Sequence, residues 1–289
     1  RRTTWGDMAL ASWFRSTTRP EVSDTPIERL ADPPAGTSVV GAALVLVTVG
    51  LFSLSVLAAG GILNLPSATI GAFGGLVLLA VWTRSPAAMH VSIFALLAAL
   101  AYRTPEFGTH PFPLLNALLG YALVVLCSRR LRESFGWLHT GSLEPGVRRL
   151  ILGTAAASLI ALAIWFSMTD REFAGITAIA DVPLWALPPT GLFFALVNAG
   201  VEEAAFRGVL LDSIHSAVGA IGALFIQAAV FGIAHYAHGV PDGPWGAVLS
   251  GGYGLMLGVI RLRSRGMLAP WIAHAITDAA IFVMIVMST

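Results

Sequence analysis

The stretch that decides the fold is residues 188–214, PPTGLFFALVNAGVEEAAFRGVLLDSI, in which Glu202, Glu203 and Arg207 interrupt an apolar run. At about 1.5 Å per residue, such a run is long enough to cross the roughly 30 Å of bilayer hydrocarbon. Ionisable side chains inside a membrane span cost several kcal/mol and therefore face a protein interior or a wet cavity. We expect a transmembrane helix whose carboxylates mark a functional site.

Similar apolar runs recur along the chain. With 56% hydrophobic and 11% charged residues and a mean hydropathy of +0.78, the 289 residues do not fit an ordinary soluble domain. The runs lack the alternation of apolar and polar residues that a membrane barrel requires. We predict an all-α, polytopic transmembrane helix bundle of about eight or nine spanning helices, at 38–63, 67–83, 87–102, 113–128, 149–168, 188–214, 219–237, 244–260 and 267–287.

The basic residues predict the orientation in the membrane. All 17 are arginines, which we interpret as the coding bias of a GC-rich bacterium. The net charge of the chain is only +1, which argues against a nucleic-acid partner. Two arginines, Arg103 and Arg171, fall on the side of the membrane opposite the N-terminus. Fourteen fall on the N-terminal side, which the positive-inside rule makes cytoplasmic: Arg1, Arg2, Arg15, Arg19, Arg29, Arg84, Arg129, Arg130, Arg132, Arg148, Arg149, Arg261, Arg263 and Arg265. We expect an integral protein of the bacterial inner membrane.

The chain divides at an arginine-rich break. We predict a cytoplasmic N-terminal segment at 1–37, scaffold helices at 38–128, a cytoplasmic loop at 129–148 and a catalytic transmembrane core at 149–289. The connection at 169–188 is expected either to cover the site or simply to join two helices. The lone Cys127 excludes an internal disulfide and a cysteine-rich metal site.

The candidate site combines residues from three predicted helices. Glu203 and Arg207 are four residues apart, which suits an ion pair, while Glu202 points about 100° away. His274 and Asp278 share a helix face in the same way.

Counted from the cytoplasmic turns expected near 217 and 264, the candidate residues lie at similar depths. Glu202, His235, His274 and Asp278 fall roughly 22, 27, 15 and 21 Å along their helices. The cluster is expected to be reached from the cytoplasmic side or laterally from lipid. The other histidines, among them His90 and His110, are expected at span ends or in loops in solvated or capping roles.

Such a cluster suits peptide hydrolysis without a serine or cysteine nucleophile. A carboxylate in a partly dry cavity becomes a better general base, and a neighbouring neutral histidine can share and orient its water. A second histidine can hold the oxyanion. Glu203 and Arg207 fit a purely structural pair equally well, and a packing role is the alternative for Glu202.

The ordered motifs Glu202-Glu203-x-x-x-Arg207, Phe231-x-x-x-His235 and His274-x-x-x-Asp278 resemble those of the CPBP intramembrane proteases, which include the type II CAAX prenyl endopeptidases. The resemblance implies a helical bundle with a conical cavity, and a glutamate-dependent endopeptidase that cleaves a membrane-associated or lipidated peptide. It assigns water activation to Glu202 with His235, and the oxyanion to His274 with Asp278. Glu203 and Arg207 would orient the site.

Two features of the motifs bear on the mechanism. No His-Glu-x-x-His motif occurs, so we expect no cofactor and no metal; a metal ion bound through Glu202, His235 and His274 is the alternative. The family often has Asn where this chain has Asp278. An ionised Asp cannot donate a hydrogen bond to an oxyanion, so Asp278 is either protonated or structural.

Other functions are also open at this stage. The motifs of presenilin-like and rhomboid proteases are missing or incomplete. A catalytically idle relative, acting as a structural subunit or assembly factor of a membrane complex, is the main alternative to an enzyme. A proton-coupled transporter is a third possibility, because carboxylates and histidines also relay protons. Its charges would form a path across the membrane, whereas here they cluster at one depth.

Overall fold

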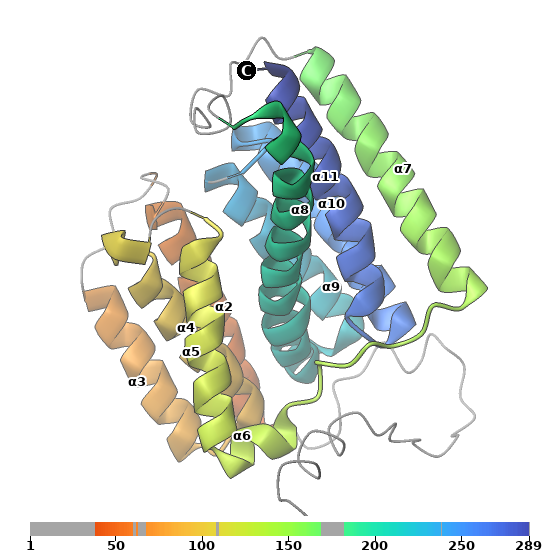
Figure 1. Cartoon of the computed structure of the whole chain (residues 1–289). Helices are drawn as coiled ribbons and strands as arrows, with labels where there is room; N and C mark the ends of the chain where they lie inside the picture. Colours follow the sequence, from red (N-terminus) through yellow and green to blue (C-terminus); the bar gives the residue numbers. More distant parts are fainter. Residues whose placement is uncertain are drawn as a thin grey trace, which may run out of the picture.

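The computed structural model describes residues 38–59, 62, 68–107, 110–168, 182–237 and 239–288, and these residues form helices without any strand (Figure 1). The predicted all-α membrane bundle is therefore confirmed. The predicted segment 1–37 and most of the connection at 169–188 lie outside the described residues. The helices are α2 (Val39–Ala59), α3 (Ala68–Trp82), α4 (Pro86–Ala101), α5 (Phe112–Cys127), α6 (Arg129–Ser134), α7 (Pro145–Ser167), α8 (Leu187–Glu203), α9 (Leu211–Ala237), α10 (Gly243–Ser264) and α11 (Leu268–Ser288).

Five apolar stretches of the described chain are long enough to cross a membrane, and three shorter apolar helices, α3 to α5, accompany them. The longest stretch, Leu184–Ala237, contains α8, a π-helical segment at Ala204–Leu210 and α9. It bends at Gly219, whose φ of 76° favours a residue without a side chain. The bend separates the predicted spans 188–214 and 219–237, and the turn expected near 217 lies there.

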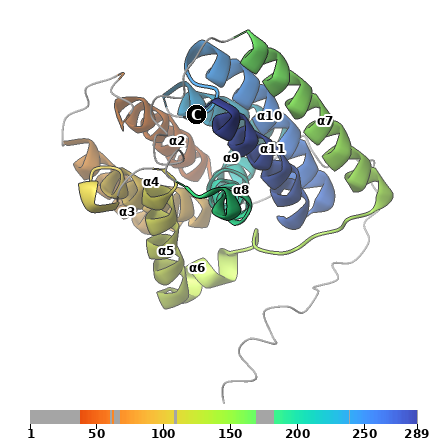
Figure 2. The ribbon, with the colours of Figure 1, turned by 45° about the horizontal axis from the view of Figure 1, so that its top comes forward.

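The helices form two neighbouring groups (Figures 1 and 2). Helices α2 to α5 make one group, and α7 to α11 make the other. The groups meet where α2 and α4 pack against α9 and where α5 contacts α8. Helix α8 belongs to the second group and also contacts α5 of the first, so its carboxylates are within reach of side chains from either half of the chain.

Serine caps set the starts of α4 and α6. Ser85 accepts a hydrogen bond from the Ala88 backbone N–H before α4, and Ser128 accepts one from the Leu131 N–H before α6. The predicted loop 129–148 is thus partly helical. The cap at Ser128 restarts a helix after α5 ends.

Small residues let α9 and α10 pack closely beside the candidate site. A Cβ atom added at Gly232 would lie 2.5 Å from the Ala247 carbonyl oxygen, so only glycine permits this approach. Close contact through small residues is the usual basis of helix association in membranes. It fixes the position of the neighbouring Phe231 and of His235, one turn further along α9.

Candidate functional site

Glu202, in the last turn of α8, has two differently placed carboxylate oxygens. Its Oε1 lies 3.0 Å from the His110 Nε2 and accepts a hydrogen bond of 3.2 Å from the Asn198 amide. Its Oε2 is buried and has no hydrogen-bond partner among the described residues. The carboxylate is therefore held through Oε1, while Oε2 makes a longer contact of 3.6 Å with the His274 Nε2.

His110 belongs to the short segment between α4 and α5, in the half of the chain predicted to be scaffold. Its Nε2 faces Glu202 and, at 3.0 Å, the Asn198 carbonyl oxygen, and both are acceptors, so this nitrogen carries the proton. Its Nδ1 lies 3.2 Å from the Tyr102 hydroxyl. The expectation that His110 has a merely solvated or capping role was wrong, because the packing of α5 against α8 brings it to Glu202.

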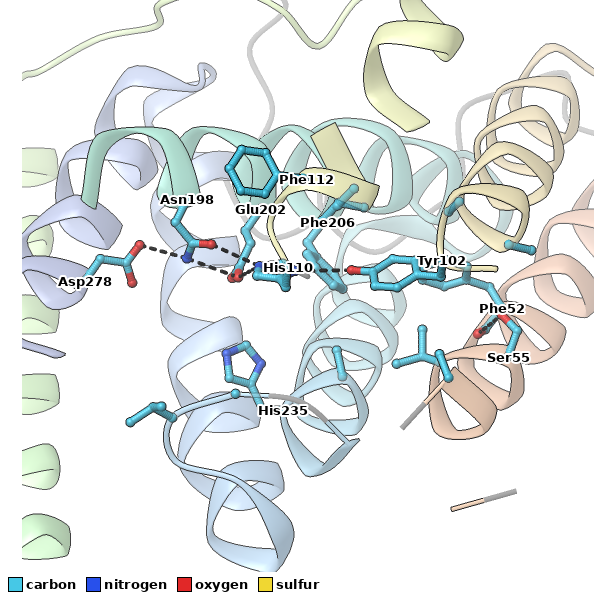
Figure 3. Close-up of a pocket in the computed structure, with 18 of the residues that line it drawn as sticks. Phe52, Ser55, Tyr102, His110, Phe112, Asn198, Glu202, Phe206, His235 and Asp278 are labelled. Atoms are coloured by element: carbon cyan, nitrogen blue, oxygen red, sulfur yellow. Dashed lines mark hydrogen bonds and ion pairs between the residues drawn. The ribbon is translucent and has the colours of Figure 1, made fainter. Parts of the chain in front are cut away.

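Asn198 was not among the predicted site residues, although its spacing from Glu202 was a signal. It precedes Glu202 by four residues and so shares its helix face. Its amide nitrogen donates to Glu202 and, at 3.1 Å, to the Asp278 Oδ2. Asn198 therefore links the acidic residues of α8 and α11 (Figure 3).

Glu203 anchors a second, more deeply buried group. Its Oε1 accepts hydrogen bonds from Arg207 Nη1 at 2.9 Å and from His274 Nδ1 at 2.7 Å. Arg207 is fully buried, donates to the Gly254 carbonyl at 3.3 Å and lies 4.3 Å from the centre of the Phe231 ring. The predicted Glu203–Arg207 pair is confirmed as a contact.

His274 lies between the carboxyl groups. Its Nε2 is 3.5 Å from the Asp278 Oδ1 and 3.6 Å from the Glu202 Oε2, both longer than a good hydrogen bond. Its Nδ1, bound to Glu203, makes the short contact. The predicted proximity of His274 and Asp278 is present, but the strongest contact of His274 is with Glu203.

His235, near the end of α9, has a defined tautomer. Its Nδ1 lies 3.0 Å from the Phe231 carbonyl oxygen, which can only accept, so this nitrogen donates. In the neutral ring Nε2 is then an acceptor. This is the arrangement needed to receive a hydrogen bond from water.

A cavity of about 830 Å³ lies between the two helix groups and reaches these residues (Figure 3). Of the predicted site residues, Glu202, His235 and Asp278 line it, together with His110 and Asn198. Glu203, Arg207 and His274 are not among its lining residues, and each is almost wholly buried. Most of the remaining lining is apolar, including Phe52, Val56, Phe194, Phe206 and Phe282. The site thus has a polar wall that faces the cavity and a buried polar group behind it.

The metal-bound alternative depends on how the possible ligands are arranged. Within the described ranges, no three His, Cys, Asp or Glu side chains are grouped as a metal ion would require. Glu202, His235 and His274, the ligands of the metal-bound alternative, contact other partners. Each has instead a hydrogen bond to another protein group.

Comparisons with known proteins agree with the motifs. Residues 184–280 match the family model described as "Type II CAAX prenyl endopeptidase Rce1-like". No curated protein and no solved structure matches the chain. The match contains all six predicted site residues and excludes helices α2 to α7, among them the segment that carries His110. The resemblance read from the motifs is confirmed over these residues: residues 184–280, about a third of the chain, are similar to the Rce1-like type II CAAX prenyl endopeptidases.

Proposed function

We propose that the protein is a glutamate-dependent intramembrane endopeptidase in which Glu202 activates water. The observation that carries this proposal is the asymmetry of the Glu202 carboxylate. Oε1 is held by His110 and Asn198, whereas the buried Oε2 has no hydrogen-bond partner among the described residues and lies 3.6 Å from the His274 Nε2. Glu202 as a residue lines an apolar cavity. A general base must be fixed in position and still have a free lone pair, and Glu202 satisfies both conditions.

The hydrolysis uses the two acceptors that line the cavity. Water bound between Glu202 Oε2 and His235 Nε2 attacks the carbonyl carbon of the peptide bond, and Glu202 takes the proton that the water loses. The carbonyl oxygen becomes an oxyanion in the tetrahedral intermediate. Glu202 then passes the proton to the amide nitrogen, the C–N bond breaks, and a carboxylic acid and an amine leave.

The oxyanion needs an N–H donor, and Asn198 is placed to supply one. Its amide nitrogen lies between Glu202 and Asp278 on the cavity wall. The family resemblance would put an amide at position 278, where this chain has a carboxyl group. Both N–H bonds of Asn198 already donate, one to Glu202 and one to Asp278. We infer that Asn198 on α8 performs the donor role by turning the N–H bond now accepted by Asp278 toward the oxyanion.

We expect Asn198→Asp to lower the cleavage rate by about 10²–10³-fold, the usual cost of losing one oxyanion donor. Asp278→Asn should retain cleavage, since it adds a donor to the same wall. The exchange variant Asn198→Asp/Asp278→Asn should recover much of the loss. Initial rates with one cleaved peptide measure all three, and an inactive Asp278→Asn protein of native stability would contradict the assignment.

His110 should act as a positioning residue for Glu202. We expect His110→Phe to lower the turnover number by about 10–100-fold, the range seen for groups that orient a catalytic residue. His110→Gln should restore most of the activity, because its amide N–H can donate to Glu202 Oε1. Equal losses in both variants, with KM unchanged, would show that His110 does not act through its hydrogen bond.

The proposed reaction requires no metal ion. We expect EDTA and 1,10-phenanthroline to leave the cleavage rate of the purified protein unchanged. Both chelators should be tested against a zinc protease under the same detergent conditions. A loss of activity that added Zn²⁺ restores would favour the metal-dependent alternative.

The setting we propose is a bacterial inner membrane with the N-terminus in the cytoplasm, and the substrate is a membrane-associated or lipidated peptide. The apolar cavity lining supports such a substrate.

To test the function, peptide termini in membranes should be compared by mass spectrometry between cells that carry the native chain and cells that carry Glu202→Gln at matched expression. Termini that need Glu202 would identify substrates. Identical termini, with the variant folded, would favour the catalytically idle subunit.

A further inference from the structure

The bundle has one end where the arginines gather. Backbone hydrogen bonds join the segment after α6 to the α10–α11 turn, from Ser142 N–H to Ser264 O at 2.8 Å and from Met267 N–H to His139 O at 2.8 Å. Arg130 in α6 donates to the Arg84 carbonyl in the α3–α4 turn. These contacts place the α3–α4 turn, α6, the start of α7 and the end of α10 at the same end, the lower one in Figure 1. We call it the arginine end.

Nine of the eleven arginines in the described residues lie at the arginine end. They comprise one in the α3–α4 turn, three in α6, two in the first turn of α7, and three at the end of α10 and in the turn after it. Of the other two, Arg103 follows α4 at the opposite end, and Arg207 is buried in between. By the positive-inside rule the arginine end is cytoplasmic.

The cavity lies toward the opposite end. Its lining includes residues at the connections between successive helices. Ala59 ends α2, Thr69 lies at the start of α3, and Arg103 follows α4. Phe112 begins α5, Thr190 lies in the first turn of α8, and Val240 follows α9. Every one of these positions is at or near a helix terminus remote from the arginine end.

At this side of the bundle, helix α9 ends close to the site. His235 is only two residues from the end of α9, about 3 Å along the helix axis. Glu202 is fifteen residues from the start of α8, about 22 Å, and Asp278 is ten residues from the end of α11, about 15 Å. Toward the end remote from the arginines, α8 and α11 therefore extend well past the site, whereas α9 and α10 end near it.

Packed side chains close the route from the arginine end. Leu210, Ile214, Leu257 and Ile260 are all 0% exposed and fill the bundle on the cytoplasmic side of Arg207. From the sequence, we expected access from the cytoplasmic side or from lipid. The cavity lining instead reaches the other end of the bundle.

We propose that the cavity opens to the extracytoplasmic side, so that its substrate is a membrane peptide whose cleaved bond is presented on that side. The choice of substrate rests on the proposed function, but the direction of opening does not. Peptides that are exported or that span the membrane would be accessible to such a site. Peptides confined to the cytoplasmic leaflet would not.

Cysteine accessibility tests the direction without any activity measurement. In a Cys127→Ser background, Ser55→Cys and Thr190→Cys place thiols on the cavity wall, from α2 and α8. Glu106→Cys and Ser142→Cys are exposed reporters for the two ends. A membrane-impermeant maleimide is applied to intact spheroplasts and to inverted inner-membrane vesicles, and folding is checked by size-exclusion chromatography.

In spheroplasts, we expect the Ser55→Cys and Thr190→Cys proteins to be labelled, as Glu106→Cys is. In inverted vesicles, we expect both to lose labelling, so that only Ser142→Cys reacts. Labelling of both cavity thiols from the side of Ser142 would overturn the proposal. Labelling from neither side would overturn it as well, since the cavity would then open only to lipid. If the labelling is as expected but Glu202→Gln changes no peptide termini, the direction stands and the protease function fails.

Discussion

The Glu202→Gln protein should cleave its peptide about 10²–10⁴-fold more slowly than the native protein, the range that a general base contributes. Glutamine keeps an oxygen that can accept from His110 and Asn198, so the hydrogen bonds now made by Oε1 can persist. It replaces the unpartnered oxygen by an amide group that cannot take a proton from water. The loss should therefore fall on turnover and leave substrate binding nearly unchanged.

The rate is measured with a peptide that spans a cleavage site found in the terminus comparison, in detergent micelles or proteoliposomes. Glu133→Gln is the matched control, because Glu133 lies on the surface of α6 in an exposed pair with Arg129. It should keep the native rate. If Glu202→Gln also keeps it, another group activates the water and the proposed mechanism is wrong.

The Arg207→Met protein should lose about 3–5 kcal/mol of stability, the usual cost of removing one member of a buried ion pair. Arg207 is 0% exposed, and its guanidinium binds Glu203 and the Gly254 carbonyl while lying against Phe231. Methionine fills much of the same volume but leaves the Glu203 carboxylate without its guanidinium partner. Equilibrium unfolding with SDS in mixed micelles measures the change.

The matched variant for this prediction is Glu203→Gln/Arg207→Met. It removes the carboxylate charge along with the guanidinium, so the double variant should be more stable than the sum of the two single losses predicts. His274 Nδ1 can still donate to the glutamine oxygen. Additive losses would show that the pair contributes little and would favour a mainly catalytic role for Arg207.

Much of the fold could be predicted because membrane spans are governed by local sequence. An apolar run must be helical to satisfy its backbone in lipid, and its length is set by the bilayer. For this reason the predicted runs agree with the helices within a few residues, even at the bend at Gly219. Within one helix, the spacing of four residues was enough to predict that Glu203 meets Arg207.

The contacts made by His110 could not be predicted in the same way. It lies 92 residues before Glu202, outside the matched domain, and follows an apolar helix like many polar loop residues. No periodicity relates two helices that are distant in sequence. Only the docking of α5 on α8 brings the ring to the carboxylate.

The sequence by itself determined the helical bundle, its arginine asymmetry and the set of acids and histidines at similar depth, because each depends on hydrophobic length or on spacing along one helix. Only the tertiary structure decided which carboxylate oxygen of Glu202 accepts hydrogen bonds and which does not. It also placed Glu202, His235 and Asp278 on the cavity wall with Glu203, Arg207 and His274 behind it, and showed at which end the cavity lies. These properties depend on how helices from both halves of the chain pack together, and such packing is a relation between side chains that no single segment encodes.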